Sequence, residues 1–230
     1  MTDFPNMTDF GRPVAGDPQL GADDIRRLFD QVSTHLRDTG SVGHHLMIAG
    51  GAALALMWQD RTTRDVDVLE HRFRAPAGPS DQRRTNAVDF ISMRFPAELS
   101  RAARLVADAE GLRRNWLNGA AAIFTPDCEL DPRVLHRNDP LTVEAPAPAV
   151  LLAMKLYAAR PTDLQDAARL TSDTNLTYPD ELYTLVTDAY GADALTDTTI
   201  DFAHHALKLA QRDTPGRHQQ PPDRGLSTGR

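Results

Sequence analysis

The sequence predicts an α+β protein in which a small mixed sheet with flanking helices is followed by an α-helical C-terminal half. Two observations predict this class. First, an apolar strand pattern over Leu46–Ala49 runs into the pair Gly50 and Gly51, a short helix pattern and a second strand pattern that ends at Leu69. Second, most of the periodic segments after residue 145 have apolar residues at helical spacing.

We expect four parts along the chain. Residues 1–20 are predicted to be a flexible N-terminal segment, and residues 21–145 to form the core that carries the sheet. Residues 146–211 are predicted to be a helical region that completes the functional site, and residues 212–230 a polar, disordered tail. No internal repeat or long Gly/Ser linker divides the chain.

The first predicted helix covers Asp23–Thr39, and Gly40 is typical of a helix C-terminus. Its inward residues are predicted to be Ile25, Leu28, Phe29, Val32 and Leu36. After the two strand patterns and the helix between them, the Pro/Gly/Arg-rich stretch His71–Asn86 predicts a loop.

The middle of the chain is predicted to hold one helix and three short strands. The strands are predicted over Ala87–Met93, Ala120–Thr125 and Leu141–Val143, and the helix over Pro96–Gly111. The inward residues of that helix are predicted to be Leu99, Ala102, Leu105, Val106 and Ala109.

The C-terminal half is predicted to contain a series of helices. Pro148 begins a helix that runs through Ala159, and Thr162 with Gln165 predicts a capping box for the next. Two more helices are predicted over Asp180–Ala189 and Thr199–Gln211.

Composition predicts a cytoplasmic protein without a membrane partner. The chain has a single cysteine, Cys128, and shows neither a secretory leader pattern nor a long apolar span. Its net charge of -7 argues against an indiscriminate nucleic-acid coat. Arginines nevertheless outnumber acids between Arg61 and Arg114, which indicates either a local basic rim or an ordinary solvated face.

Two carboxylates in the second strand pattern predict a cation site. In an extended strand Asp65 and Asp67 point to the same side, roughly 6.6 Å apart, while Val66 and Val68 face the core. Carboxylate oxygens are the ligands that hard cations such as Mg²⁺ prefer. The alternative is the solvated face of an edge strand, where acidic residues are ordinary.

The glycine pair before the short helix predicts a phosphate contact. Gly50 and Gly51 leave backbone N–H groups accessible at a helix N-terminus, where the helix dipole favours anions. A simple tight turn from strand to helix would also need glycine, and the two interpretations are compatible.

The neighbouring histidine pairs His44-His45 and His204-His205 are predicted to be structural, because adjacent side chains point apart.

Three stretches, taken together, resemble a known superfamily. They are GGAA from Gly50 followed by RTTRDVDVL from Arg61, NWLN from Asn115, and LLAMKLYAARPTDLQD from Leu151. In this order they resemble the nucleotidyltransferase superfamily of DNA polymerase β-like enzymes. Within it, the chain is most similar to the AbiEii-like or MenT-like toxins and related uncharacterised bacterial proteins.

The resemblance implies a minimal polymerase β-like nucleotidyltransferase fold and a reaction. An NMP would move from an NTP to an acceptor hydroxyl with Mg²⁺, or alternatively Mn²⁺, as cofactor. The toxin relatives imply the tRNA 3′ end as the RNA acceptor and a cognate antitoxin as partner; other superfamily members would permit a protein or a small molecule. The alternative is a catalytically degenerate protein of the same fold that binds a nucleotide or a partner.

The resemblance also assigns roles to residues. Asp65 and Asp67 would hold the metal, with Asp89 as a candidate third ligand whose alternative is an exposed polar residue. Lys155 and Asp166 would complete the catalytic set, the alternative being a structural salt bridge. Nucleotide contacts are assigned to Gly50, Gly51, Arg61, Thr63, Arg64 and Lys155.

Two further positions have structural interpretations. Asp163 is expected to be an acid in a first helical turn, stabilised by the helix dipole. In the NWLN stretch, Trp116 and Leu117 are expected to be core residues or a loop anchor, and the asparagines local turn formers.

Overall fold

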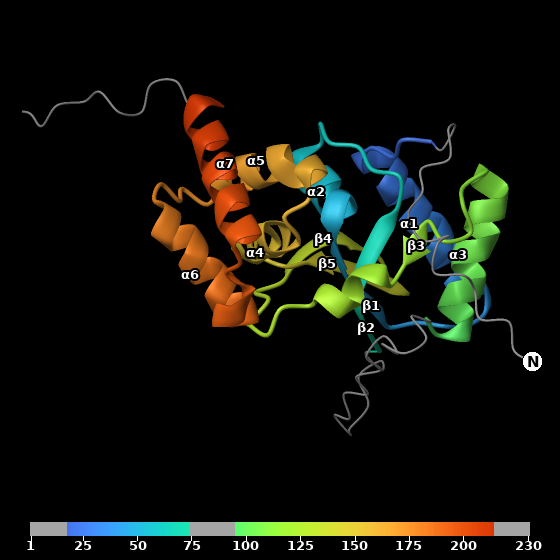
Figure 1. The fold of residues 1–230 in the computed structure, drawn as a ribbon. Coiled ribbons are helices and arrows are strands. Elements are labelled where there is room, and N and C mark those ends of the chain that lie inside the picture. Colours follow the sequence, from blue (N-terminus) through green and yellow to red (C-terminus); the bar gives the residue numbers. More distant parts are fainter. Residues whose placement is uncertain (1–17, 74–94, 214–230) are drawn as a thin grey trace, which may run out of the picture. The chain divides into compact units, whose positions relative to one another are not determined.

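The computed structural model describes residues 18–73 and 95–213, drawn in colour in Figure 1. The chain divides into two compact units, and each is described by itself. The first unit comprises residues 1–125 and 129–147, and the second comprises 126–128 and 148–230. The predicted strand Ala87–Met93, the candidate ligand Asp89 and most of the two predicted terminal segments lie outside the described residues.

The first unit contains a small mixed sheet of five strands, so the predicted α+β class is confirmed. The order is β3-β2-β1-β5-β4. β1 is antiparallel to β2 and parallel to β5, while β3 is parallel to β2 and β4 is antiparallel to β5. The strands are β1 (His44–Ala49), β2 (Val66–Phe73), β3 (Leu117–Asn118), β4 (Arg133–Arg137) and β5 (Leu141–Ala145).

Strand β2 contains a β-bulge at Leu69. Met47 of β1 pairs with Glu70, whereas the next residue, Ile48, pairs with Val68, so Leu69 is the extra residue. Val66 and Val68 are buried, as predicted, and Leu69 is buried beside them. The strand continues to Phe73, so the prediction of a loop beginning at His71 is wrong for its first three residues.

Helix α1 (Ala22–Asp38) ends as its sequence predicts. All five predicted inward residues are buried. Gly40 has φ +68° and its N–H donates to the Arg37 carbonyl at 2.9 Å, while the Ser41 N–H donates to the Leu36 carbonyl at 2.9 Å. This pair of bonds satisfies carbonyl groups that the helix end leaves open.

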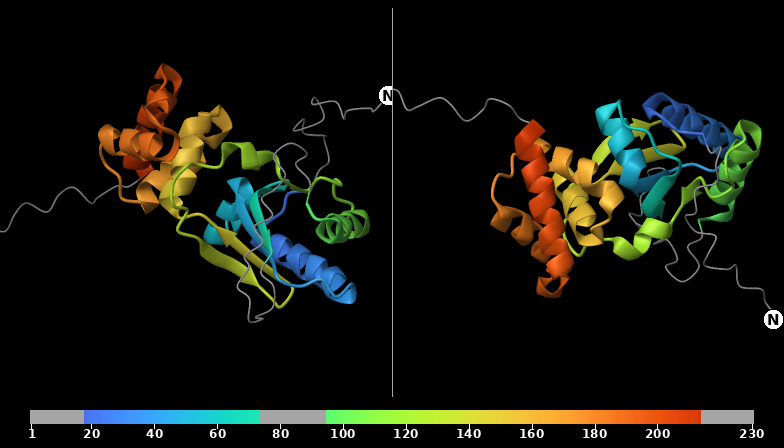
Figure 2. Two further views of the ribbon diagram at one scale, coloured as in Figure 1. Left: turned by 90° about the horizontal axis from the view of Figure 1, so that it is seen from below. Right: turned by 45° about the horizontal axis from the view of Figure 1, so that its top comes forward.

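Helix α3 (Ala97–Glu110) lies beside α1 (Figures 1 and 2). Its buried stripe differs from the prediction, because Leu105 is 43% exposed and Ala109 is exposed. Ala103 and Ala107 are buried instead. The buried stripe therefore follows i, i+3, i+4, i+7 and i+8 from Leu99, with positions 103 and 107 in place of the predicted 105 and 109.

Residues Ala120–Phe124 form a short 3₁₀ helix, η2, rather than the predicted strand. The carbonyl oxygen of the Asn118 side chain accepts a hydrogen bond from the Ala120 N–H at 2.9 Å, which begins the turn. Short runs of small apolar residues have no periodicity that separates a strand from a helix. Just before this turn, the indole N–H of the buried Trp116 donates to the Ala103 carbonyl at 2.9 Å.

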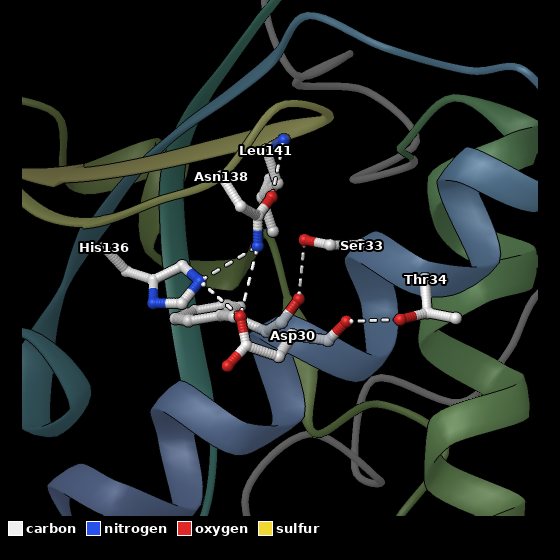
Figure 3. A network of polar contacts seen from close by, with 7 residues as sticks. Asp30, Ser33, Thr34, His136, Asn138 and Leu141 are labelled. Carbon is white, nitrogen blue, oxygen red and sulfur yellow. Dashed lines mark hydrogen bonds and ion pairs between the residues drawn. The ribbon is translucent and has the colours of Figure 1, made fainter.

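A polar network holds the β4–β5 hairpin against α1 (Figure 3). The side-chain amide of Asn138 donates to Asp30 Oδ1 at 3.2 Å, and His136 Nε2 lies 3.2 Å from the same oxygen. The Leu141 N–H donates to Asn138 Oδ1 at 3.2 Å, and the His136 ring packs against Phe29. The network thus fixes β4, an edge strand that the sequence did not predict.

The second unit is helical. The predicted capping box of Thr162 and Gln165 is wrong, because α5 begins after Asp163 and its N-cap has no side-chain hydrogen bond. A 3₁₀ turn over residues 161–163 already precedes that helix. The helices are α4 (Pro148–Ala158), η3 (Pro161–Asp163), α5 (Leu164–Asp173), α6 (Pro179–Tyr190), η4 (Ala192–Ala194) and α7 (Asp197–Asp213).

Among the residues described here, no helix combines the length and apolarity needed to cross a membrane.

Two histidines are buried side by side on β1 and β2. His44 is 0% and His71 is 1% exposed. His44 Nδ1 lies 3.0 Å from His71 Nε2, and the Ser41 hydroxyl lies 2.8 Å from His44 Nε2. Burial lowers the pKa of each ring from 6.5 to about 4. Both rings are therefore neutral core residues at neutral pH.

The histidine pair predicts a loss of stability in mild acid. The unfolded rings bind protons near pH 6.5 and the folded ones only near pH 4, so the unfolded state binds more protons between these values. The free energy of unfolding should therefore fall as the pH drops from 6.5 to 4, by at most roughly 3 kcal/mol per ring. Urea unfolding across this range measures the slope. The double variant His44→Leu/His71→Leu should flatten it, and an unchanged slope would contradict the assignment.

Candidate functional site

The two predicted metal ligands lie where β2 begins. Asp67 is the second residue of β2, half-buried, opposite Ala49 of β1 and beside Asn118 of β3. Asp65 is exposed and lies in the bend before the strand rather than on it, because β2 begins at Val66. The site therefore combines one carboxylate fixed by the sheet with one on the adjoining loop.

The carboxylate of Asp67 packs directly against Gly50. Gly50 is the first residue of α2 (Gly50–Trp58) and has φ +62°, which L side chains rarely adopt. A Cβ atom at this position would lie 2.6 Å from Asp67 Oδ2. Glycine is thus needed here for two reasons, its backbone angle and the space that the carboxylate occupies.

Gly51 has a similar close neighbour. A Cβ atom there would lie 2.6 Å from Thr63 Oγ1 and 3.9 Å from an Arg61 guanidinium nitrogen. The Thr63 hydroxyl also donates to the Asp65 carbonyl at 3.2 Å. The start of α2 is therefore surrounded by one carboxylate, one hydroxyl and one guanidinium, from residues that the sequence had nominated. Arg64, also nominated, is exposed.

The electrostatics of α2 favour an anion at this end. Its first turn contains no acidic residue, and the helix N-terminus carries a partial positive charge. The Arg61 guanidinium adds a full positive charge and is anchored by donating to the Thr62 carbonyl. The Asp67 carboxylate already lies at this helix end, so a phosphate group here would need a cation between itself and Asp67.

The glycine at position 50 provides a prediction with a matched control. Gly50→Ala adds backbone strain and displaces the Asp67 carboxylate, so binding of Mn²⁺ at this site should weaken by at least about tenfold. Gly111→Ala adds the same kind of strain at φ +66°, but nothing lies within 4 Å of its added Cβ. Thermal unfolding should therefore show a loss for both variants, while only Gly50→Ala loses Mn²⁺ binding. Equal Mn²⁺ binding by the two variants would remove Gly50 from the site.

Lys155, in the second unit, lies between two acids. Its Nζ is 3.0 Å from Asp166 Oδ2, the contact that the sequence suggested, and it is also paired with Asp163. The exposed fractions of the three side chains are 10% for Lys155, 16% for Asp163 and 6% for Asp166. Asp163 is therefore more than an acid near a helix N-terminus, because its carboxylate neutralises a buried ammonium.

Asn118 is a neighbour of the site that the sequence does not predict. It pairs with Asp67 in the parallel register of β2 and β3. The sequence predicts a turn former at this position, and its side chain does accept a hydrogen bond from the Ala120 N–H. The NWLN stretch belongs to the sequence resemblance, but no local pattern predicts that Asn118 lies beside Asp67 of β2.

Two carboxylates, Asp65 and Asp67, lie at the start of β2. Asp65 and Asp67 offer carboxylate oxygens, the ligands that Mg²⁺ prefers. The absence of a side chain at Gly50 leaves the Asp67 carboxylate room against α2. Within residues 18–73 and 95–213, no group of three or more His, Cys, Asp or Glu side chains is arranged to hold a metal. The candidate site thus offers two protein carboxylates among the described residues.

Comparisons of the chain with protein-family models, with curated proteins and with solved structures returned no match. We therefore infer function from the chemistry of its own residues and from the sequence resemblance.

Proposed function

We propose that this chain is a Mg²⁺-dependent nucleotidyltransferase with a minimal polymerase β-like fold. The observation that carries the proposal is the contact between Asp67 Oδ2 and Gly50 at the first residue of α2. It joins a cation ligand to a helix start suited to phosphate, and a metal–nucleotide complex presents both chemistries at once.

The candidate-site residues of the first unit have separate roles in this proposal. Asp65 and Asp67 hold Mg²⁺, or Mn²⁺ in its place. The backbone at Gly50 and Gly51 donates hydrogen bonds to the phosphates, and Arg61 neutralises part of their charge. When bound, the metal supplies neutralisation of the triphosphate charge and a more acidic acceptor hydroxyl.

The reaction is an in-line displacement. The acceptor oxygen forms a bond to the α-phosphorus as the bond from that phosphorus to the pyrophosphate oxygen breaks, and the hydroxyl proton leaves to solvent. The residues act by holding the groups in line and by stabilising charge. We extend the proposal to Lys155 and Asp166, because buried ionic clusters with fixed geometry occur at functional sites as well as in structural networks.

The acceptor we propose is an RNA, the 3′ end of tRNA, with the chain acting as the toxin of a toxin–antitoxin pair. The sequence resemblance supports this choice. Exposed arginines of the first unit provide a sequence-independent way to contact an RNA backbone, and Arg101 and Arg104 of α3 are examples.

Incubation with each α-labelled NTP, Mg²⁺ and total cellular RNA or protein tests the proposal. We expect label on RNA of tRNA size, from the wild-type chain only and not from Asp67→Asn. Label on protein would keep the reaction and overturn the acceptor. Nucleotide binding without any transfer would favour the alternative, a degenerate protein of the same fold that binds a nucleotide or a partner.

A further inference from the structure

A short strap just before α1 contacts the loop that leads to Asp65. Leu20 forms an isolated antiparallel bridge with Thr63, in which the Leu20 N–H donates to the Thr63 carbonyl at 2.7 Å and the Thr63 N–H donates to the Leu20 carbonyl at 3.0 Å. The Thr62 hydroxyl donates to the Gln19 side-chain carbonyl at 3.1 Å. Leu20 was predicted to belong to a flexible segment, but it is only 3% exposed.

The other end of the same loop is also held from α1. The Arg26 guanidinium donates to the Gln59 side-chain carbonyl at 3.2 Å and to Asp23 Oδ1 at 3.0 Å. Gln59 ends α2 with φ +68°, where the chain turns back toward β2. The loop over residues 59–65 is therefore fixed at two points by the beginning of α1 and by the strap before it.

The loop in turn determines where the first cation ligand lies. Thr63 is held between the Leu20 backbone on one side and Gly51 on the other, since a Cβ at Gly51 would lie within 3 Å of two Thr63 atoms. Its hydroxyl donates to the Asp65 carbonyl at 3.2 Å. Displacement of Thr63 would therefore move Asp65 relative to Asp67, which the sheet holds separately.

We propose that Leu20 is a positioning residue for the cation site of Asp65 and Asp67. It acts through its buried side chain, which anchors the strap that forms the backbone bridge to Thr63. This inference rests on the proposed function. Its physical basis is preorganisation, because two carboxylates bind a cation best when the loop that carries one of them does not have to be ordered during binding.

Titration with Mn²⁺ alone, followed by the loss of the free-ion electron paramagnetic resonance signal, tests this without relying on catalysis. Leu20→Ala should weaken Mn²⁺ binding at least fivefold, and Leu20→Met, which refills the space, should restore it. The matched control is Leu36→Ala, a buried leucine at the far end of α1. It should lose thermal stability and still bind Mn²⁺ like the wild type.

A second variant allows the proposal to be tested if Leu20→Ala does not fold. Arg26→Met releases the other end of the loop from a partly exposed position and should weaken Mn²⁺ binding at least twofold. Wild-type affinity in folded Leu20→Ala, or in Arg26→Met where Leu20→Ala does not fold, with binding abolished in Asp67→Asn, would overturn the positioning role and leave the proposed function standing. No Mn²⁺ binding by the wild-type chain would overturn both.

Discussion

Asp67→Asn should reduce nucleotidyl transfer by at least about 100-fold while the chain keeps its fold, because the amide retains the size of the carboxylate and loses the charge that holds a divalent cation. The packing against Gly50 does not depend on that charge, so the thermal unfolding temperature should change little. Initial rates with labelled NTP at saturating Mg²⁺ measure the effect. Asp65→Asn should also abolish transfer, although Asp65 is exposed and lies before the strand.

The chain offers a control on the same strand. Glu70→Gln makes the same carboxylate-to-amide change three residues later, at a side chain paired with Arg72. It should leave transfer within about twofold of the wild type, since surface ion pairs contribute little. If Asp65→Asn and Asp67→Asn both transferred nucleotides at the wild-type rate, these carboxylates would not be the metal ligands.

Lys155→Met should lower the free energy of unfolding by roughly 3–5 kcal/mol, the usual effect of removing one partner from a buried ion pair. The unbranched methionine fills most of the space of the lysine stem, so the loss comes from two carboxylates left without their cation. Urea unfolding measures this change. The contact with Asp163 makes the expected loss larger than a single pair with Asp166 would.

The same contact determines which compensating variant is informative. Lys155→Met with Asp166→Leu would still leave the Asp163 carboxylate unpaired, whereas the triple variant that adds Asp163→Leu removes all three charges. We expect the triple variant to regain stability and to remain inactive. A stable and active triple variant would show that the cluster is only structural.

Much of the first unit could be predicted from local patterns. The α1 periodicity ending at Gly40 and the succession of strand, Gly50-Gly51 turn and short helix are all local signals, and the structure contains each of them. The patterns failed where local information is ambiguous. The stretch Ala120–Phe124 is apolar and short, and β4 presents mostly exposed or half-exposed residues without alternation.

The candidate site shows the same division between local and distant information. Asp67 and Gly50 could be nominated because both belong to compact motifs with a chemical meaning. Leu20 could not, because its contact with Thr63 joins residues far apart in the sequence and is made by backbone atoms, which leave no side-chain pattern. Asp163 lies at a helix start, as predicted, but its ion pair with Lys155 could not be predicted, because helix position and ion pairing both favour an acid there and only the fold shows the second.

Because of the bulge at Leu69, the residues of β2 before it and those after it alternate between the two faces of the sheet independently of each other. With strict alternation, the face that carries Asp67 would also carry His71, and Glu70 would enter the core beside Val68. The extra residue restores Glu70 to the side of Asp67 and His71 to the core. Substitutions in β2 after Leu69 can therefore change the packing around His44 and His71 without changing the side of the sheet to which Asp67 points. Deletion of Leu69 would remove the bulge and make Val68 and Glu70 consecutive in a regular ladder, so both halves should keep their present faces.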